Sequence, residues 1–125
     1  MFWRIFRPMN ITPEQLIQAL ADQTRLRSVL LLNKEGELCV CELMHSLDLI
    51  QPKVSRHLAL LRDIGLVSSR RQGQWIYYKL QPDLPSWALG MIDAIQQGAN
   101  ESASFADDIT NLNNMPNRPE SVCIP

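Results

Sequence analysis

The sequence predicts a single, mainly α-helical domain that carries a small β-hairpin. Three observations lead to this prediction. Apolar residues recur at helical spacing before residue 65 and again after residue 86. Between these regions the apolar period changes to two, and Gly73 marks the midpoint of the change. The length of 125 residues suits one domain with a core of modest size.

The first helix is predicted to start at Thr12, because Thr12, Pro13 and Gln15 form the pattern of a capping box with proline in the first turn. We expect residues 1–10 to be a disordered leader, since chain ends are poorly held. A second helix begins at Asp22 or Thr24 and ends at the turn residues 33–36.

The third and fourth predicted helices are joined by a short turn at residues 48–51. The third starts near Cys39 or Val40, and the fourth starts near Pro52 and stops at Gly65. Within the fourth helix three residues recur at i, i+4 and i+7 and should face the core: Val54, Leu58 and Leu61.

Residues 66–71 and 75–80 are predicted to be the two strands of a hairpin with Gly73 at its tip. A fifth helix follows, with Trp87, Met91, Ile92 and Ile95 as its apolar stripe. Residues 11–98 therefore predict a winged helix-turn-helix domain of about five helices and two strands. We expect residues 99–125 to be a polar, largely disordered tail, although a short helix over 102–112 is compatible with the pattern.

Charge is distributed unevenly along the chain. The net charge is −1, but residues 51–80 hold six basic residues and one acidic residue, which leaves −6 for the rest. A basic segment with acidic flanks indicates a nucleic-acid partner for that segment. A charge run is more often a solvated face, but here the positive charge gathers on one helix and its hairpin.

The chain has three cysteines, Cys39, Cys41 and Cys123. No apolar run reaches the roughly 18 residues that span a bilayer, so we expect a cytoplasmic protein with no membrane partner. Cysteines are reduced in that compartment, and a Cys-x-Cys loop is a poor disulfide because it is so short. The pair is thus available as soft thiolate ligands, although small buried hydrophobes are the alternative interpretation.

Four segments in this order and spacing resemble the ArsR family of metalloregulatory repressors, and in particular the repressors of arsenic operons. They are Ala21–Arg27, Glu37–Leu43, Gln51–Arg62 and Gly73–Tyr78. The resemblance implies a homodimer held by the first and last helices, with Leu16, Leu20, Trp87, Met91, Ile92 and Ile95 as candidate interface residues. It also implies repression of an arsenic-detoxification operon and release of the operator when arsenite, methylarsenite or antimonite binds, with no permanent cofactor.

In a helix-turn-helix the second helix enters the major groove of double-stranded DNA, and a dimer reads an inverted repeat. The candidate base-reading residues are Gln51, Ser55, Arg56 and His57. Lys53 suits a phosphate, and Arg70 and Arg71 on the hairpin suit phosphates or the minor groove.

On the thiol side, Cys39 and Cys41 should hold trivalent arsenic. Residues i and i+2 of a helix point roughly 200° apart, so we expect arsenic binding to distort the start of the third helix unless Cys39 precedes it. That distortion would move the reading helix. Repressors of arsenic operons commonly carry a third cysteine where this chain has Met44. Either Cys123 supplies a third thiolate, or two thiolates bind a methylated arsenical.

Other functions remain as alternatives. A redox-sensing repressor would use the same thiols, and a cadmium or lead sensor would add cysteines before Cys39, where this chain has none. An enzyme is not expected, because the chain has no phosphate-binding glycine loop, no H-E-x-x-H motif and no nucleophile with an identifiable base.

Overall fold

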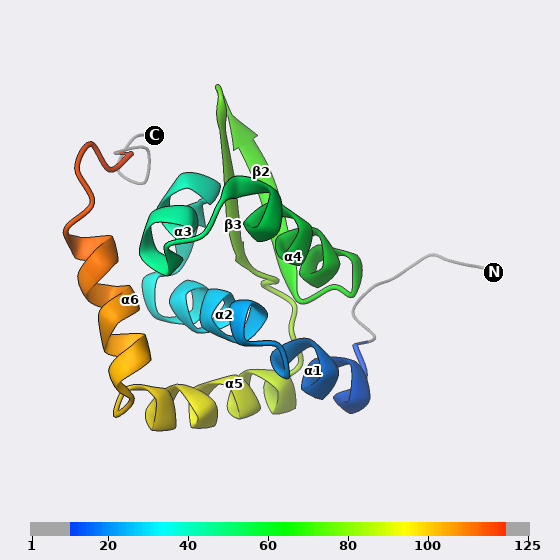
Figure 1. Ribbon diagram of the computed structural model, residues 1–125. Coiled ribbons are helices and arrows are strands. Elements are labelled where there is room, and N and C mark those ends of the chain that lie inside the picture. Colours follow the sequence, from blue (N-terminus) through cyan, green and yellow to red (C-terminus); the bar gives the residue numbers. More distant parts are fainter. Residues whose placement is uncertain (1–10, 120–125) are drawn as a thin grey trace.

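Six helices and a three-stranded sheet enclose one apolar core in the computed structural model, which describes residues 11–119 (Figure 1). The helices are α1 (Pro13–Leu20), α2 (Gln23–Glu35), α3 (Val40–Leu47), α4 (Gln51–Asp63), α5 (Ser86–Ala99) and α6 (Ala103–Asn113). The strands are β1 (Glu37–Cys39), β2 (Val67–Gln72) and β3 (Trp75–Leu80). Among these residues no helix is long and apolar enough to cross a membrane. The predicted leader (residues 1–10) and Cys123 lie outside the described residues.

The predicted caps of the first two helices are confirmed. The Thr12 hydroxyl accepts a hydrogen bond from the Gln15 backbone at 3.1 Å, and the Gln15 side chain accepts one from the Thr12 backbone at 3.0 Å. The Asp22 carboxylate accepts the Arg25 backbone N–H at 3.0 Å. Helix α2 ends at Gly36, whose φ of +95° favours glycine. These local signals fix where α1 and α2 begin and end.

Helices α3 and α4 form the predicted helix-turn-helix. The chain turns at Asp48, which adopts a left-handed conformation (φ 58°) that suits a short polar side chain. The core-facing residues predicted for α4, Val54, Leu58 and Leu61, are fully buried. Because they hold one face of α4 against the core, the opposite face of this helix is turned outward.

The sheet has three strands in the order β1-β3-β2, all antiparallel. The hairpin of β2 and β3 rises away from the helices as the wing (Figure 1). Strand β1 corrects the expectation of two strands. It has three residues, which are too few to show an alternating pattern in the sequence. Through β1 the residue Cys39 lies opposite Tyr77 of the wing.

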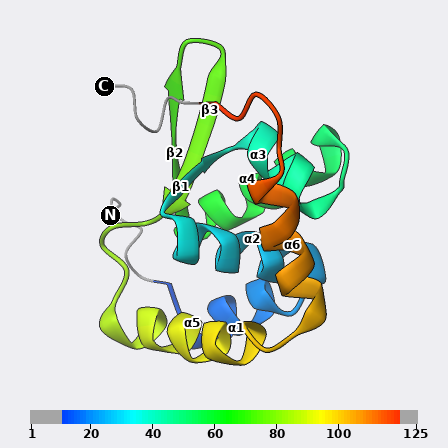
Figure 2. The same ribbon diagram turned by 90° about the vertical axis from the view of Figure 1, so that its left-hand side faces the viewer.

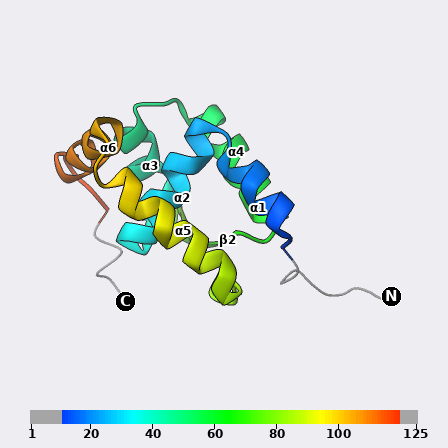
Figure 3. The same cartoon turned by 90° about the horizontal axis from the view of Figure 1, so that it is seen from below.

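The region after α5 contains the short helix that the pattern allowed over 102–112, and its packing corrects the expectation that residues beyond 99 are largely disordered. Helix α6 lies along α3 at one end of the molecule (Figure 2), and α5 runs across the side opposite the wing (Figure 3). Phe105 and Leu112 of α6 are buried. Asp108 is 1 % exposed, and its carboxylate accepts two hydrogen bonds from Arg27 at 2.8 and 2.5 Å. These contacts order a segment whose composition alone is polar.

Replacing Ser102 with alanine tests whether α6 belongs to the folded domain. The Ser102 hydroxyl accepts a hydrogen bond from the Phe105 backbone at 3.3 Å and so caps α6. Loss of an N-cap costs about 1 kcal/mol, so we expect the free energy of unfolding to fall by that amount in urea titrations. Ala103→Ser, one residue later and exposed, serves as control. An unchanged value for Ser102→Ala would mean that α6 does not contribute to folding.

Candidate thiol site and nucleic-acid interface

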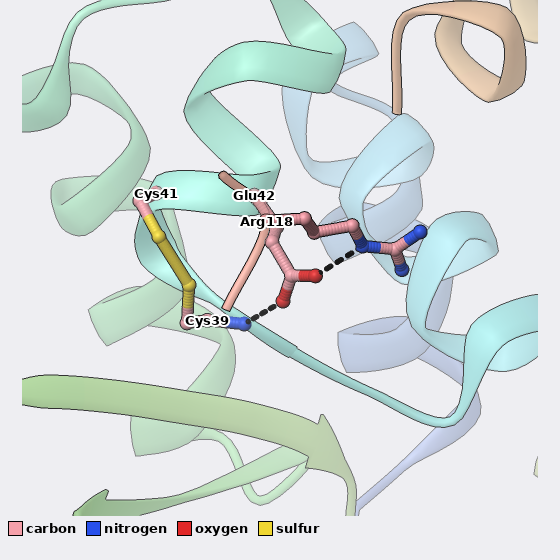
Figure 4. The surroundings of a disulfide bond; sticks show 4 residues. All are labelled: Cys39, Cys41, Glu42 and Arg118. Carbon is pink, nitrogen blue, oxygen red and sulfur yellow. Dashed lines mark hydrogen bonds and ion pairs between the residues drawn. A yellow bond between two sulfur atoms is a disulfide. The ribbon is translucent and has the colours of Figure 1, made fainter. Parts of the chain in front are cut away.

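The cysteine pair lies where β1 passes into α3. Cys39 is the last residue of β1 and the N-cap residue of α3, and its backbone is extended (φ −84°, ψ 164°). Cys41 lies in the first turn of α3. Their Cα atoms are 5.4 Å apart, within the range of disulfides, and the two sulfur atoms are joined as a disulfide (Figure 4). The short loop therefore brings the two sulfur atoms together at the start of α3.

The extended backbone of Cys39 also bears on the predicted distortion of α3. Two cysteines inside a helix would point apart, but Cys39 precedes the helix, so its sulfur meets that of Cys41 without unwinding a turn. Cys39 is fully buried and Cys41 is partly exposed. Both sulfur atoms lie at the positive end of the α3 dipole, which attracts negative charge.

A buried carboxylate stands beside the pair. Glu42 is fully buried, and its carboxylate accepts the Cys39 backbone N–H at 2.8 Å and the Arg118 guanidinium at 2.5 Å (Figure 4). Arg118 is also 3.7 Å from Glu35. A cation beside Glu42 offsets the cost of burying its charge. The sequence interpretation missed both residues, although Glu42 stands at the capping-box position relative to Cys39.

The described residues offer no third ligand beside the two cysteines. Within residues 11–119 there is no group of three or more histidine, cysteine, aspartate or glutamate residues that could hold a metal ion. Met44 is partly buried and packs against the core, as expected for a core-filling methionine.

Several of the residues predicted to contact DNA share the outward side of α4. Gln51 and Arg56 are exposed, and Lys53 and Ser55 are partly exposed. Gln51 and Lys53 lie in the first turn of α4, where a reading helix meets the bases. These four side chains are therefore not buried in the core, as contact with DNA would require.

His57 differs from these residues because it faces the start of α2. Its Nδ1 lies 3.4 Å from the Arg25 guanidinium and 3.8 Å from the Asp22 carboxylate. Burial lowers the pKa of His57, and the neighbouring Arg25 contributes to the same shift. These contacts are those of a structural histidine, which is the alternative to base reading that the position of His57, three residues after the core-facing Val54, leaves open.

The two arginines of the wing have partners within the protein. The Arg70 guanidinium donates to both carboxylate oxygens of Glu37 at 2.9 and 2.8 Å and lies over the Tyr77 ring, 4.6 Å from its centroid. This contact holds the pKa of Glu37 below its usual value. Arg71 is exposed and donates to the Gly73 carbonyl near the tip at 3.0 Å. Arg70 thus links the wing to β1, whereas Arg71 is the freer of the two for DNA.

The predicted dimer interface divides into two groups. Leu16, Leu20 and Ile92 are buried inside the protomer, so their assignment to the interface is corrected: they belong to its own core. Trp87 is 39 % exposed, and Met91 and Ile95 are partly exposed. Ile17, which the sequence interpretation missed, is 58 % exposed on α1. An apolar surface on α1 and α5 therefore remains for a partner.

The fold and these sites define a class of protein: a winged helix-turn-helix transcriptional regulator. The family model described as bacterial regulatory protein, arsR family, matches residues 22–69. The arsenic resistance transcriptional regulator ArsR2 of Pseudomonas putida is 50 % identical over 115 residues, covering 90 % of this chain and 98 % of that protein. The arsenical resistance operon repressor of Escherichia coli is 57 % identical over 83 residues, covering 66 % and 71 %.

A solved structure shows the same fold. The homodimeric winged helix-turn-helix DNA-binding domain of Mb0332 from Mycobacterium bovis, described as a possible ArsR-family regulator, has a TM-score of 0.56 and 28 % identity, covering 69 % of this chain and 76 % of that one. The chain belongs to the ArsR family, among its arsenic-resistance transcriptional repressors. It is a regulator and not an enzyme, as the sequence indicated.

Proposed function

We propose that this protein is an arsenic-responsive repressor that acts in the cytoplasm. Its dimer binds an inverted-repeat operator in double-stranded DNA, and it is released when arsenite, methylarsenite or antimonite binds the reduced thiols of Cys39 and Cys41. The observation that carries this proposal is the proximity of the two sulfur atoms at the junction of β1 and α3. Thiolates are the preferred ligands of soft ions.

At the junction of β1 and α3 the thiols are linked to both elements that we propose to contact DNA, the wing and α4. Cys39 is paired with Tyr77 in the wing, and Cys41 belongs to the helix that precedes the reading helix α4. The Glu37–Arg70 ion pair ties β1 to the wing a second time. A change in the sulfur–sulfur geometry would shift β1 and the first turn of α3 together. We therefore propose that inducer binding moves the wing and α4 relative to each other, without a need to unwind α3.

The proposed DNA contacts are those whose side chains are available. Gln51, Ser55 and Arg56 would contact base edges, and Lys53 and Arg71 would contact phosphates. Arg70 and His57 would act indirectly through Glu37 and Asp22. Dimerisation through Ile17, Trp87, Met91 and Ile95 would set two α4 helices about one DNA turn apart. The homodimeric description of the Mb0332 domain supports this arrangement.

A trivalent arsenic atom bound by two cysteines has a third ligand, and we propose two alternatives for it. Cys123 lies five residues beyond Arg118, which contacts Glu42 beside the thiol pair. Five residues span at most about 17 Å, which suffices for a cysteine tethered near the site. Alternatively the arsenical keeps one of its own substituents, a hydroxyl or a methyl group. Both proposals use Cys39 and Cys41.

Titration of the operator complex with arsenite and with methylarsenite tests the proposed function. Fluorescence anisotropy of labelled operator is followed in excess reductant, for wild type and for Cys123→Ser. We expect wild type to release the operator with at least one of the two arsenicals. Loss of arsenite release in Cys123→Ser would assign the third thiolate, and retention would assign a two-thiolate site. Release by neither arsenical from wild type would contradict the proposed function.

The disulfide favours a second candidate function, a redox-sensing repressor. Two thiols so close together can pass two electrons and two protons to an oxidant such as hydrogen peroxide and form the Cys39–Cys41 bond. Release of the operator by peroxide without arsenic, and its reversal by reductant, would support this function. Release by an arsenical in excess reductant separates the two candidates, because the disulfide cannot persist under that condition.

A further inference from the structure

Tyr77, the wing residue paired with Cys39 in the sheet, carries a buried hydroxyl. Tyr77 is fully buried, and among residues 11–119 its hydroxyl oxygen has no hydrogen-bond partner. Such a group destabilises a folded protein and is rare enough to need an explanation. The hydroxyl is not used by the fold, by the wing or by any of the proposed DNA contacts.

The sheet register puts Tyr77 next to the cysteines. Tyr77 of β3 is directly opposite Cys39 of β1, and opposed residues in antiparallel strands project from the same face with Cβ atoms about 4.5–5.5 Å apart. On its other side Tyr77 is opposite Arg70, whose guanidinium covers the ring. In the sheet Tyr77 therefore lies between Arg70 of β2 and Cys39 of β1, one of the two thiol residues.

A phenol hydroxyl carries a proton that it can donate to an oxygen acceptor. The Glu42 carboxylate accepts the Cys39 backbone N–H, so it is already engaged with the same cysteine that Tyr77 is paired with. Among residues 11–119 the Tyr77 hydroxyl is therefore a hydrogen-bond donor without an acceptor.

We propose that the Tyr77 hydroxyl recognises an oxygen on the arsenical bound at Cys39 and Cys41, and so favours inorganic arsenite over methylarsenite. This inference rests on the proposed function. Arsenite in water carries three hydroxyl groups. Two As–S bonds replace two As–O bonds, the two thiol protons leave with the two hydroxyls as water, and arsenic stays trivalent. One hydroxyl remains on arsenic, and it would accept the bond from Tyr77.

Methylarsenite provides an internal comparison. Its hydrated form carries two hydroxyls and one methyl group, so binding by two thiolates releases two waters and leaves only the methyl group. A methyl group cannot accept a hydrogen bond, and the Tyr77 hydroxyl would stay without a partner. A site built to bond an oxygen discriminates against a ligand that lacks it, because a buried polar group is then left unsatisfied.

Substitution of Tyr77 by phenylalanine tests the inference. The dissociation constants of arsenite and methylarsenite are measured by calorimetry in excess reductant, on the full chain with Cys123→Ser so that no third thiolate competes. We expect Tyr77→Phe to weaken arsenite about threefold to tenfold and to leave methylarsenite within about twofold. Tyr78→Phe is the matched control, because Tyr78 is buried on the opposite face of β3, opposite Leu38.

Three outcomes are distinguishable. A fall in the preference for arsenite over methylarsenite in Tyr77→Phe alone supports the inference. Equal weakening of both arsenicals, or no change in either, overturns it, because a purely structural role would affect both ligands alike. Failure of both arsenicals to bind the protein that retains Tyr77 would instead contradict the proposed function. The melting temperature of Tyr77→Phe should be unchanged or higher, since the removed hydroxyl has no partner among residues 11–119.

Discussion

Replacing Cys39 with serine is expected to abolish the response to arsenite while the protein still folds and binds its operator. Cys39 is the N-cap residue of α3, and serine is among the residues that helices prefer there. The backbone bond from Cys39 to Glu42 does not involve the sulfur and would persist. The substitution therefore removes one thiolate and little else.

The expected loss is large because the two thiolates act as a chelate. Once one sulfur holds arsenic, the second binds at a high effective concentration, and removal of either should weaken arsenite by about 10²–10⁴-fold. The measurement is the arsenite concentration that releases half of a labelled operator, in excess reductant. Met44→Leu is the matched control, since it preserves volume in the same helix and should respond like wild type. A Cys39→Ser protein that still responds like wild type would contradict the thiol site.

Replacing Arg56 with alanine is expected to remove most operator binding. Arg56 is exposed near the start of α4, and loss of an arginine that bonds guanine costs about 1–3 kcal/mol. A dimer carries two copies, so the total is about 2–6 kcal/mol, or at least about 30-fold in affinity. Anisotropy at one fixed salt concentration measures this loss, because affinity for DNA depends strongly on salt.

Arg62→Ala is the matched control for the DNA prediction. Arg62 carries the same charge on the same helix, and its side chain is 48 % exposed, but it lies in the last turn, away from the end that enters the groove. We expect a clearly smaller loss than for Arg56→Ala. Equal losses in the two variants would mean that charge alone binds DNA, and no loss in either would mean that α4 is not the reading helix.

Much of the fold could be predicted because its signals are local. Thr12, Asp22 and Gly36 mark helix ends through caps and a left-handed turn, and these act over three or four residues. The hairpin follows from the change of period around Gly73. Strand β1 and the ordering of α6 could not be predicted in this way. Both depend on partners distant in sequence: Tyr77 for Cys39, and Arg27 for Asp108.

Only part of the thiol site could be predicted, for the same reason. Cys39 and Cys41 were identified from their spacing and from the resemblance of the surrounding segments. Arg118 contacts Glu42 from 76 residues away, and no pattern in the polar segment around it indicates that contact. The interface residues Leu16 and Ile92 were misassigned because an apolar stripe does not reveal whether it faces the protomer's own core or a partner.

We expect one trivalent arsenic atom, bound by Cys39 and Cys41, to accompany release of the operator. X-ray absorption at the arsenic edge, on reduced protein that arsenite has freed from DNA, identifies the atoms that surround it. The first shell should contain sulfur, and that shell should be lost in the Cys39→Ser/Cys41→Ser protein. A first shell of oxygen alone in wild type, or a sulfur shell that persists in the double variant, would contradict this expectation.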